Sequence, residues 1–285
     1  MLRLRSAPFI LFVALLLLPA LVWAADRKVW KLGLRPPAKI LRVDNIDARQ
    51  AYARVAVTHL AKRLRAAGIK EFSLTVVDAS TLHFETGVDR DEGWMAALLT
   101  APGSLQLRPV RAGVPNWVEL ASSLPVGVEI RGEKEPWLWA PQRDLLEPWL
   151  ARVSLAGVTI ETMPDEGGVR TISLGETLGT ERGVRDVRVD RSTTGAPYLE
   201  VTLDGATGAR LAALAGSGVE QVAIVLDGEV IGVVRTSTLR ADQRLRISVP
   251  DGATADTRTL RQAWVEQVAG RLAAPFPVPI AVLKE

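Results

Sequence analysis

The chain has no cysteine among its 285 residues and only two histidines. The absence of cysteine excludes a disulfide framework, a thiol nucleophile, a thiolate metal site and a lipid-modified cysteine. His59 falls on the solvated face of a predicted helix, and His83 points outward from a predicted strand. Neither histidine belongs to a cluster with metal-ligand spacing, so we expect no metal and no cofactor.

Sequence motifs of catalysis are also missing. The chain contains no GxSxG, HExxH, GxxxxGK or GxGxxG pattern. One catalytic class stays open, a hydrolase with a carboxylate pair, which needs two acids about 5 to 9 Å apart in a cleft. Its candidate residues are Asp89, Asp91, Glu92, Asp186 and Asp190. Because such acids are usually solvated charges, the sequence favours a protein that is not an enzyme, and we assign no catalytic residue.

The charge balance is nearly neutral once the N-terminus is set aside. The formal net charge is +3, and Arg3 and Arg5 contribute two of these charges, so the chain after residue 24 carries +1. The basic isoelectric point therefore gives no indication of a nucleic-acid partner. An apolar share of 48% is that of a folded globular protein.

Residues 1–24 have the three parts of a secretory signal peptide. Two arginines precede an apolar run from Phe9 to Val22, and Val22-Trp23-Ala24 offers a cleavage site before Ala25. The alternative is an uncleaved anchor, because Pro8 to Ala25 approaches the length needed to span a bilayer. In both cases we expect a periplasmic or otherwise exported protein, which meets the membrane only through an uncleaved N-terminus.

Residues 25–112 show the pattern of a ferredoxin-like subdomain. Helical spacing predicts one helix at Asp47–Gly68 and a second at Glu92–Leu99. Alternating apolar residues predict two strands between these helices and one strand on either side of them. The resulting order is that of a split βαβ fold. The expected strands are Lys39–Val43, Phe72–Val77, Thr81–Glu85 and Ser104–Val110.

Residues 113–168 are rich in proline and tryptophan. We interpret this stretch as short strands and turns that connect two subdomains. Four of the eight tryptophans fall here, namely Trp117, Trp137, Trp139 and Trp149. An exposed cluster of these side chains would bind extended polypeptide, whereas tryptophans more often fill a local core.

The strongest local signal is a β-hairpin in VAIVLDGEVIGVV, Val222 to Val234. Asp227-Gly228 is a two-residue turn between two apolar runs, and such a turn determines the strand register. We expect the pairs Leu226–Glu229, Val225–Val230, Ile224–Ile231 and Ala223–Gly232. Both faces are apolar, which indicates either a buried central hairpin or one face against a bound partner. Val230 and Ile231, with Trp137 and Trp139, are therefore the candidate polypeptide contacts.

Residues 169–285 predict an α+β head subdomain with a mixed or antiparallel sheet around this hairpin. The tail alternates proline before a last edge strand, and a return of this strand to the first subdomain is one expectation. The other expected strands are Val187–Val189, Tyr198–Leu203, Leu245–Val249 and Ile280–Leu283, and the expected helices are Thr207–Ala215 and Thr254–Leu272.

Several segments, in chain order, resemble the periplasmic domain of the preprotein translocase subunit SecD, which has a base and a head. VAIVLDGEVIGVV is similar to the family's AIVLDG hairpin. The other similar segments are Leu32-Gly33-Leu34, His59 to Glu71, Gly103 to Val110, Arg182 to Leu214 and Ala273 to Ile280.

Three departures limit what the resemblance implies, and one is Gly232-Val233-Val234, which replaces the family's small-Ala-Pro step after the hairpin. Arg35-Pro36-Pro37 stands where the family has polar and glycine residues, and the sequence ends at Glu285 without the family's transmembrane bundle. The resemblance implies contact with unfolded or translocating polypeptide, or with a membrane translocase component, and not a proton-driven motor. A structural domain of an envelope assembly is a further alternative to a free binding protein.

Overall fold

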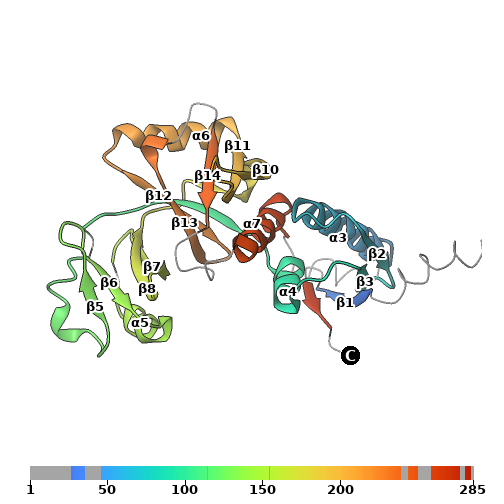
Figure 1. Ribbon diagram of the computed structural model, residues 1–285, viewed down its shortest axis with the longest axis horizontal. Coiled ribbons are helices and arrows are strands. Elements are labelled where there is room, and N and C mark those ends of the chain that lie inside the picture. Colours follow the sequence, from blue (N-terminus) through green and yellow to red (C-terminus); the bar gives the residue numbers. More distant parts are fainter. Residues whose placement is uncertain are drawn as a thin grey trace, which may run out of the picture. The chain divides into compact units, whose positions relative to one another are not determined.

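The computed structural model describes residues 27–35, 46–113, 115–153, 155–238, 243–249, 258–276 and 280–283. The N-terminal signal and the strand expected at Lys39–Val43 lie outside these ranges. The described residues form helices and antiparallel sheets (Figure 1), which confirms the α+β class. No helix within those ranges is long and apolar enough to span a membrane.

The chain divides into two compact units. The first comprises residues 1–61, 69–100 and 278–285, and the second comprises residues 62–68 and 101–277. Both boundaries expected from the sequence, near residues 112 and 168, fall inside the second unit. The stretch expected to connect two subdomains therefore belongs to the larger unit.

The first unit has the ferredoxin-like order of elements. Its sheet has the strand order β15-β1-β3-β2, and all neighbouring strands are antiparallel. Helices α3 and α4 make the two crossovers, so the chain order is strand, helix, strand, strand, helix, strand. The elements are β1 (Lys28–Leu34), α3 (Ile46–Ala66), β2 (Phe72–Val76), β3 (Thr81–Thr86), α4 (Glu92–Thr100) and β15 (Ile280–Val282).

Alternation along the strands builds the core of the first unit. Leu32 on β1 pairs with Leu82 on β3, and both are fully buried together with Phe84. The helices bury residues at helical spacing. The buried helical residues of this unit include Ala53, Ala56 and Leu60 of α3 and Met95, Leu98 and Leu99 of α4.

The prediction that Ser104–Val110 is the fourth strand of the first unit was wrong. β15 takes that place, and Leu32 pairs with Val282. The strand formed instead, β4 (Leu105–Pro109), pairs with β12 in the second unit, where Leu107 faces Ile224. An alternating apolar pattern specifies which face of a strand is buried but not which strand lies beside it.

The described residues of the second unit form three antiparallel sheets. Their strand orders are β13-β12-β4-β9, β10-β11-β14 and β5-β6-β8-β7. The remaining elements are β5 (Glu129–Arg131), β6 (Trp137–Ala140), α5 (Arg143–Leu150), β7 (Thr159–Asp165), β8 (Gly168–Leu174), β9 (Gly179–Thr180), β10 (Val184–Arg191), β11 (Pro197–Leu203), α6 (Gly205–Ala212), β12 (Gln221–Leu226), β13 (Glu229–Arg235), β14 (Arg244–Ser248), α7 (Arg258–Ala273) and four short 3-10 turns, η1 (Ala121–Ser123), η2 (Glu181–Gly183), η3 (Ala213–Gly216) and η4 (Thr236–Thr238).

Strands β12 and β13 form the predicted hairpin, but its register changes at a bulge. Asp227 and Gly228 have φ angles of 54° and 87°, as a two-residue hairpin turn requires. Leu226 faces Glu229 and Val225 faces Val230, as expected. The expected pairs Ile224–Ile231 and Ala223–Gly232 were wrong, because Ile231 is an extra residue and Ile224 faces Gly232.

The bulge decides which side chains share a face. After an extra residue, every following side chain moves to the other face of the strand. Val233 therefore packs with Ala223, Val225 and Val230 in a core shared with β7 and β8. Without the bulge, Val233 would share the face of Ile224 and Leu226. Val234 takes the position expected for Val233, in the largest core. Both faces of β12 are covered by this chain.

Residues 117–169 have a core of their own. Trp117 and Leu146 are buried, and Trp149 packs against Trp117 with ring centroids 6.2 Å apart. Leu138 and Ala140 of β6 are fully buried in the same cluster. The short strands and turns interpreted here from the sequence belong to a four-stranded sheet that packs with helix α5.

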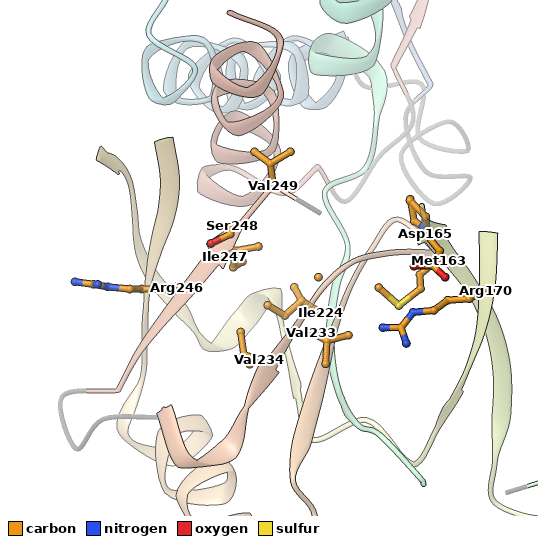
Figure 2. Close-up of a pocket in the computed structure, with 12 residues that line it drawn as sticks. Met163, Asp165, Arg170, Ile224, Val233, Val234, Arg246, Ile247, Ser248 and Val249 are labelled. Carbon is orange, nitrogen blue, oxygen red and sulfur yellow. The ribbon is translucent and has the colours of Figure 1, made fainter. Parts of the chain in front are cut away.

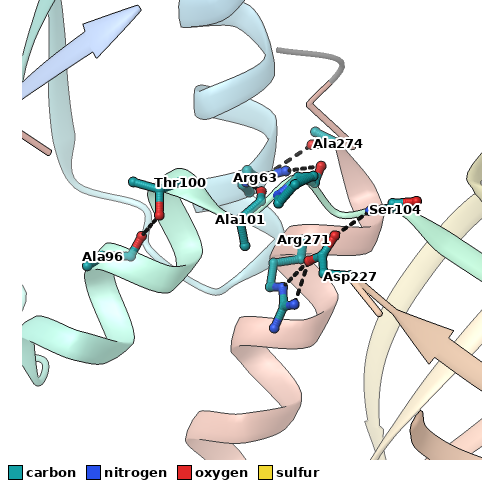
Figure 3. Close-up of polar contacts among 9 residues, drawn as sticks. Arg63, Ala96, Thr100, Ala101, Ser104, Asp227, Arg271 and Ala274 are labelled. Carbon is teal, nitrogen blue, oxygen red and sulfur yellow. Dashed lines mark hydrogen bonds and ion pairs between the residues drawn. The ribbon is translucent and has the colours of Figure 1, made fainter. Parts of the chain in front are cut away.

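A buried arginine holds two segments of the second unit together. Arg63 is fully buried and donates Nη1 to the Ala101 carbonyl at 2.6 Å and Nε to the Ala274 carbonyl at 3.1 Å (Figure 3). Nη2 donates to the Pro102 carbonyl, and the guanidinium lies 4.9 Å from the centroid of the Phe276 ring. Burial lowers the pKa of Arg63 to about 10, so the side chain is charged at neutral pH.

The hairpin turn is attached to the same region through Asp227. Its carboxylate accepts hydrogen bonds from the Ser104 backbone N–H at 2.7 Å and from Nε of Arg271 at 3.0 Å (Figure 3). Both members of the ion pair are nearly buried, with 10% and 12% of their side chains exposed. The sequence identified Asp227 only as a turn former. The ion pair adds a structural reason for aspartate at this position.

Replacing Arg63 by methionine is expected to lower the free energy of unfolding by about 3 kcal/mol or more. The substitution keeps the apolar stem but removes the donor from the Ala101 and Ala274 carbonyls, while the Pro102 carbonyl still accepts from the Phe276 N–H. Urea denaturation of the purified protein measures the change. Lys62→Met is the matched control, because Lys62 is exposed on the same helical turn and should change stability by less than about 0.5 kcal/mol. Equal effects of the two substitutions would contradict this role of Arg63.

Replacing Asp227 by asparagine tests the ion pair separately from the turn. Asparagine tolerates positive φ and keeps an acceptor for Ser104, but it leaves the Arg271 charge uncompensated. We expect the unfolding free energy to fall by about 1 to 3 kcal/mol. In a double-mutant cycle with Arg271→Gln, the two effects should not add, because each change removes the same pair. Strict additivity would argue against the pair.

Candidate binding groove

The two hairpin residues expected to contact polypeptide lie in the protein core. Val230 is 2% exposed and Ile231 is 7% exposed. Val230 packs with Met163 and Ile172, while Ile231 packs in the larger core on the other side of the hairpin. Neither side chain reaches solvent in this conformation, so a ligand would meet other residues of β13 first.

The two tryptophans expected to contact polypeptide, Trp137 and Trp139, are half-buried on one face of β6. They point away from Leu138 and Ala140, which alternate with them and lie in the core of residues 117–169. Trp117, in contrast, is buried in that core. The four tryptophans therefore do not form a single exposed cluster.

Two arginines stack on these tryptophans. The Arg131 guanidinium lies 3.7 Å from the centroid of Trp139, and that of Arg170 lies 5.5 Å from the centroid of Trp137. Arg170 faces Trp139 across the strand pair β6–β8, so its stacking on Trp137 is diagonal. Such contacts keep a cation beside an aromatic face without neutralising its charge.

The second unit contains a groove that Arg170 helps to line. It has a volume of about 280 Å³ and is bounded by β13, β14 and the β7–β8 hairpin (Figure 2). Its apolar lining comes from the strands that enclose it, and its charged side chains stand at the margins. The lining residues are Met163, Pro164, Asp165, Arg170, Ile224, Gly232, Val233, Val234, Arg246, Ile247, Ser248 and Val249.

Two strand edges border this groove. Among the described strands, β13 pairs only with β12, and β14 pairs only with β11. Each strand therefore has one side of its backbone outside a ladder. Free N–H and C=O groups along a strand edge can pair with an added extended chain.

Gly232 keeps part of the groove open. A Cβ at this position would meet only Cγ2 of Ile247, at 3.4 Å, which is ordinary contact. Gly232 follows the bulge on β13, and Ile247 of β14 lies opposite its Cβ position. Sequence reasoning placed the polypeptide contact on Val230 and Ile231, close in the chain to this position, but it could not foresee β14 beside β13.

The carboxylates considered for catalysis have structural or solvent-exposed roles. Asp89 forms an ion pair with Lys28 and has 94% of its side chain exposed, and Asp91 accepts a hydrogen bond from the Trp94 N–H. Asp186 pairs with Arg188. The Arg191 N–H holds the pKa of Asp190 below its usual value, whereas a general acid needs a raised pKa.

Two of these acids, on β10, lie too far apart for a catalytic pair. Asp186 and Asp190 are four residues apart on β10, which places them about 13 Å apart along an extended strand. That distance exceeds the separation that glycoside hydrolysis needs. Glu92 begins α4. Within the described ranges, no group of three or more His, Asp or Glu side chains is arranged to hold a metal ion.

No protein-family model and no curated protein matches the chain. Solved structures of SecDF are similar to the chain. The structure described as SecDF in super-membrane-facing form is 18% identical, with a TM-score of 0.51. SecDF described as a membrane component that enhances protein export is 15% identical, with a TM-score of 0.49, and SecDF from Thermus thermophilus is 17% identical, with a TM-score of 0.33.

The extent of these matches differs between the two partners of each comparison. The match with the super-membrane-facing form covers 96% of this chain and 34% of that chain. The match with the Thermus thermophilus structure covers 95% of this chain and 34% of that one. The match with the membrane component that enhances protein export covers 90% of this chain and 99% of that one. The chain thus spans about a third of the two longer SecDF chains. Its fold, over nearly its whole length, is that of a part of SecDF.

Proposed function

We propose that this protein is an exported, non-catalytic SecD-like protein that binds extended polypeptide in relation to protein export. The observation that carries the proposal is the groove between β13 and β14, since both strands present a free edge to it. Its apolar lining suits side chains that a folded protein would bury. An unfolded chain offers both these side chains and unpaired backbone groups.

Strand edges explain how such a site accepts many sequences. The backbone of an extended chain has the same pattern of donors and acceptors whatever its side chains are. Hydrogen bonds to β13 or β14 would therefore supply affinity with little dependence on sequence. The apolar groove would add burial of alternate side chains.

The cellular setting is part of the same proposal. SecDF is described as a membrane component that enhances protein export. By analogy, we place this protein in the periplasm or another exported location, with residues 1–24 as a signal peptide or an anchor. A membrane translocase component is then a second partner, beside the translocating chain. Determination of the mature N-terminus by mass spectrometry distinguishes cleavage from anchoring.

Photocrosslinking at the groove tests polypeptide binding directly. A photoreactive residue at Ser248, exposed on β14, or at Val234, half-buried on β13, should form adducts with a secretory chain arrested during export. Val126 is the control site, since it is 96% exposed and does not line the groove. Equal labelling from all three sites would mean random collision. Adducts with one folded envelope protein would instead favour a structural role in an assembly.

Filling the groove should weaken binding, and circular dichroism checks that each variant is folded. We expect Gly232→Leu to weaken the binding of an unfolded, fluorescein-labelled polypeptide by about tenfold or more, because the new side chain occupies the space that the ligand needs. Gly232→Ala adds only the Cβ, which meets Ile247 at an ordinary distance, and should bind nearly as the parent does. Fluorescence anisotropy measures both. Unchanged binding by Gly232→Leu would place the polypeptide elsewhere.

A further inference from the structure

One wall of the groove carries a cation without a counter-ion. Arg170 stands on β8 and extends toward Val233 and the apolar lining (Figure 2). In the part of the chain that the structure describes, its contact is the stacking on Trp137, and no carboxylate lies within ion-pair distance of it. The half-buried guanidinium therefore keeps its five N–H donors available to a ligand.

The other arginine at the groove is oriented differently. The Arg246 guanidinium lies 4.9 Å from the centroid of the Tyr198 ring, and its side chain extends away from Ile247 (Figure 2). Arg246 faces Glu200 across the strand pair β11–β14, on the outer side of that sheet. Arg170 is thus the cation that faces the groove.

Asp165 stands at the end of the same wall. It lies two residues beyond Met163, the residue that faces Arg170 across β7 and β8, so the two charges are separated by about 7 Å along the strands. They do not form an ion pair with each other, and the described residues offer Asp165 no cation within 4 Å. The wall therefore presents one positive and one negative position at the spacing of alternate residues in an extended chain.

We propose that Arg170 determines specificity in the groove by binding an aspartate or glutamate side chain of the extended polypeptide. This inference rests on the proposed function. A carboxylate is the ligand that matches the planar fork of a guanidinium, and stacking on Trp137 holds that fork in place. Asp165 disfavours a second acid two residues away and favours a base there. The preferred segments are apolar chains with a single acidic residue.

Peptide binding to the full chain tests this preference. Three fluorescein-labelled peptides share one apolar, unstructured sequence and differ only at a central Glu, Gln or Lys. We expect the wild-type protein to bind the Glu peptide about tenfold more tightly than the Gln peptide, and the Lys peptide more weakly still. The preference should shrink as salt is raised, because the partly open groove admits screening ions.

Four variants locate the preference. Arg170→Gln should bind the Glu and Gln peptides equally, and Arg170→Lys should keep part of the preference, since an ammonium ion gives no bidentate pair. Asp165→Asn should bind the Glu peptide more tightly than the wild type does, by about twofold to threefold. Arg188→Gln is the control and should leave the preference unchanged, because Arg188 pairs with Asp186 and does not line the groove. Circular dichroism checks that each variant is folded.

The outcomes separate the two proposals. Equal binding of the Glu and Gln peptides by the wild type, or a preference that survives Arg170→Gln, would overturn the role of Arg170 while leaving polypeptide binding intact. If none of the peptides binds, the proposed function itself fails. Should Arg170→Gln not fold, the opposite shifts expected for Arg170→Lys and Asp165→Asn decide the question, and their absence would overturn the inference.

Discussion

The second unit depends on β12, a strand that is apolar on both faces. Ile224 and Leu226 enter the largest core, while Ala223 and Val225 enter the core shared with β7 and β8. β12 also pairs with a neighbour on each side, β13 and β4. A strand without a solvated face must lie between two packed layers. The sheet β5-β6-β8-β7 and the helix-covered core thus both pack against the β12–β13 hairpin. The groove lies beside β13, the edge strand of its sheet.

Two buried charges hold this arrangement in place. Arg63 gives its donors to the carbonyls of Ala101, Pro102 and Ala274. Asp227 connects the hairpin turn to Ser104 and Arg271. Both groups make hydrogen bonds to backbone atoms outside the strand ladders, and an apolar residue at either position would remove those bonds. Arg63 and Asp227 therefore have structural roles. In the sequence alone, the first is an ordinary helix arginine and the second an ordinary turn aspartate.

The proposed binding site combines general and selective features. Strand edges and apolar lining are indifferent to sequence, which suits a protein that meets many chains in export. The β7–β8 hairpin adds Arg170 and Asp165, two charges without partners among the described side chains, and these are what would discriminate between chains. Asp165 comes from the stretch expected to be a connector, whereas Arg170 lies just beyond it in the expected head subdomain. In that stretch, Trp137 stacks against Arg170, while Trp117 fills a local core.

The sequence by itself determined the elements whose signal is local. The helices α3, α4 and α7, the β2–β3 pair, the Asp227-Gly228 turn and the α+β class all follow from spacing and turn chemistry over a few residues. Tertiary structure alone decided that β15 pairs with β1 and that β4 pairs with β12, because apolar alternation does not name a partner. The bulge at Ile231, which moves Val233 to the other face, is likewise invisible in an unbroken apolar run. The groove depends on these pairings and on the bulge. Its walls come from strands about seventy residues apart in the chain, and only long-range packing brings such strands together.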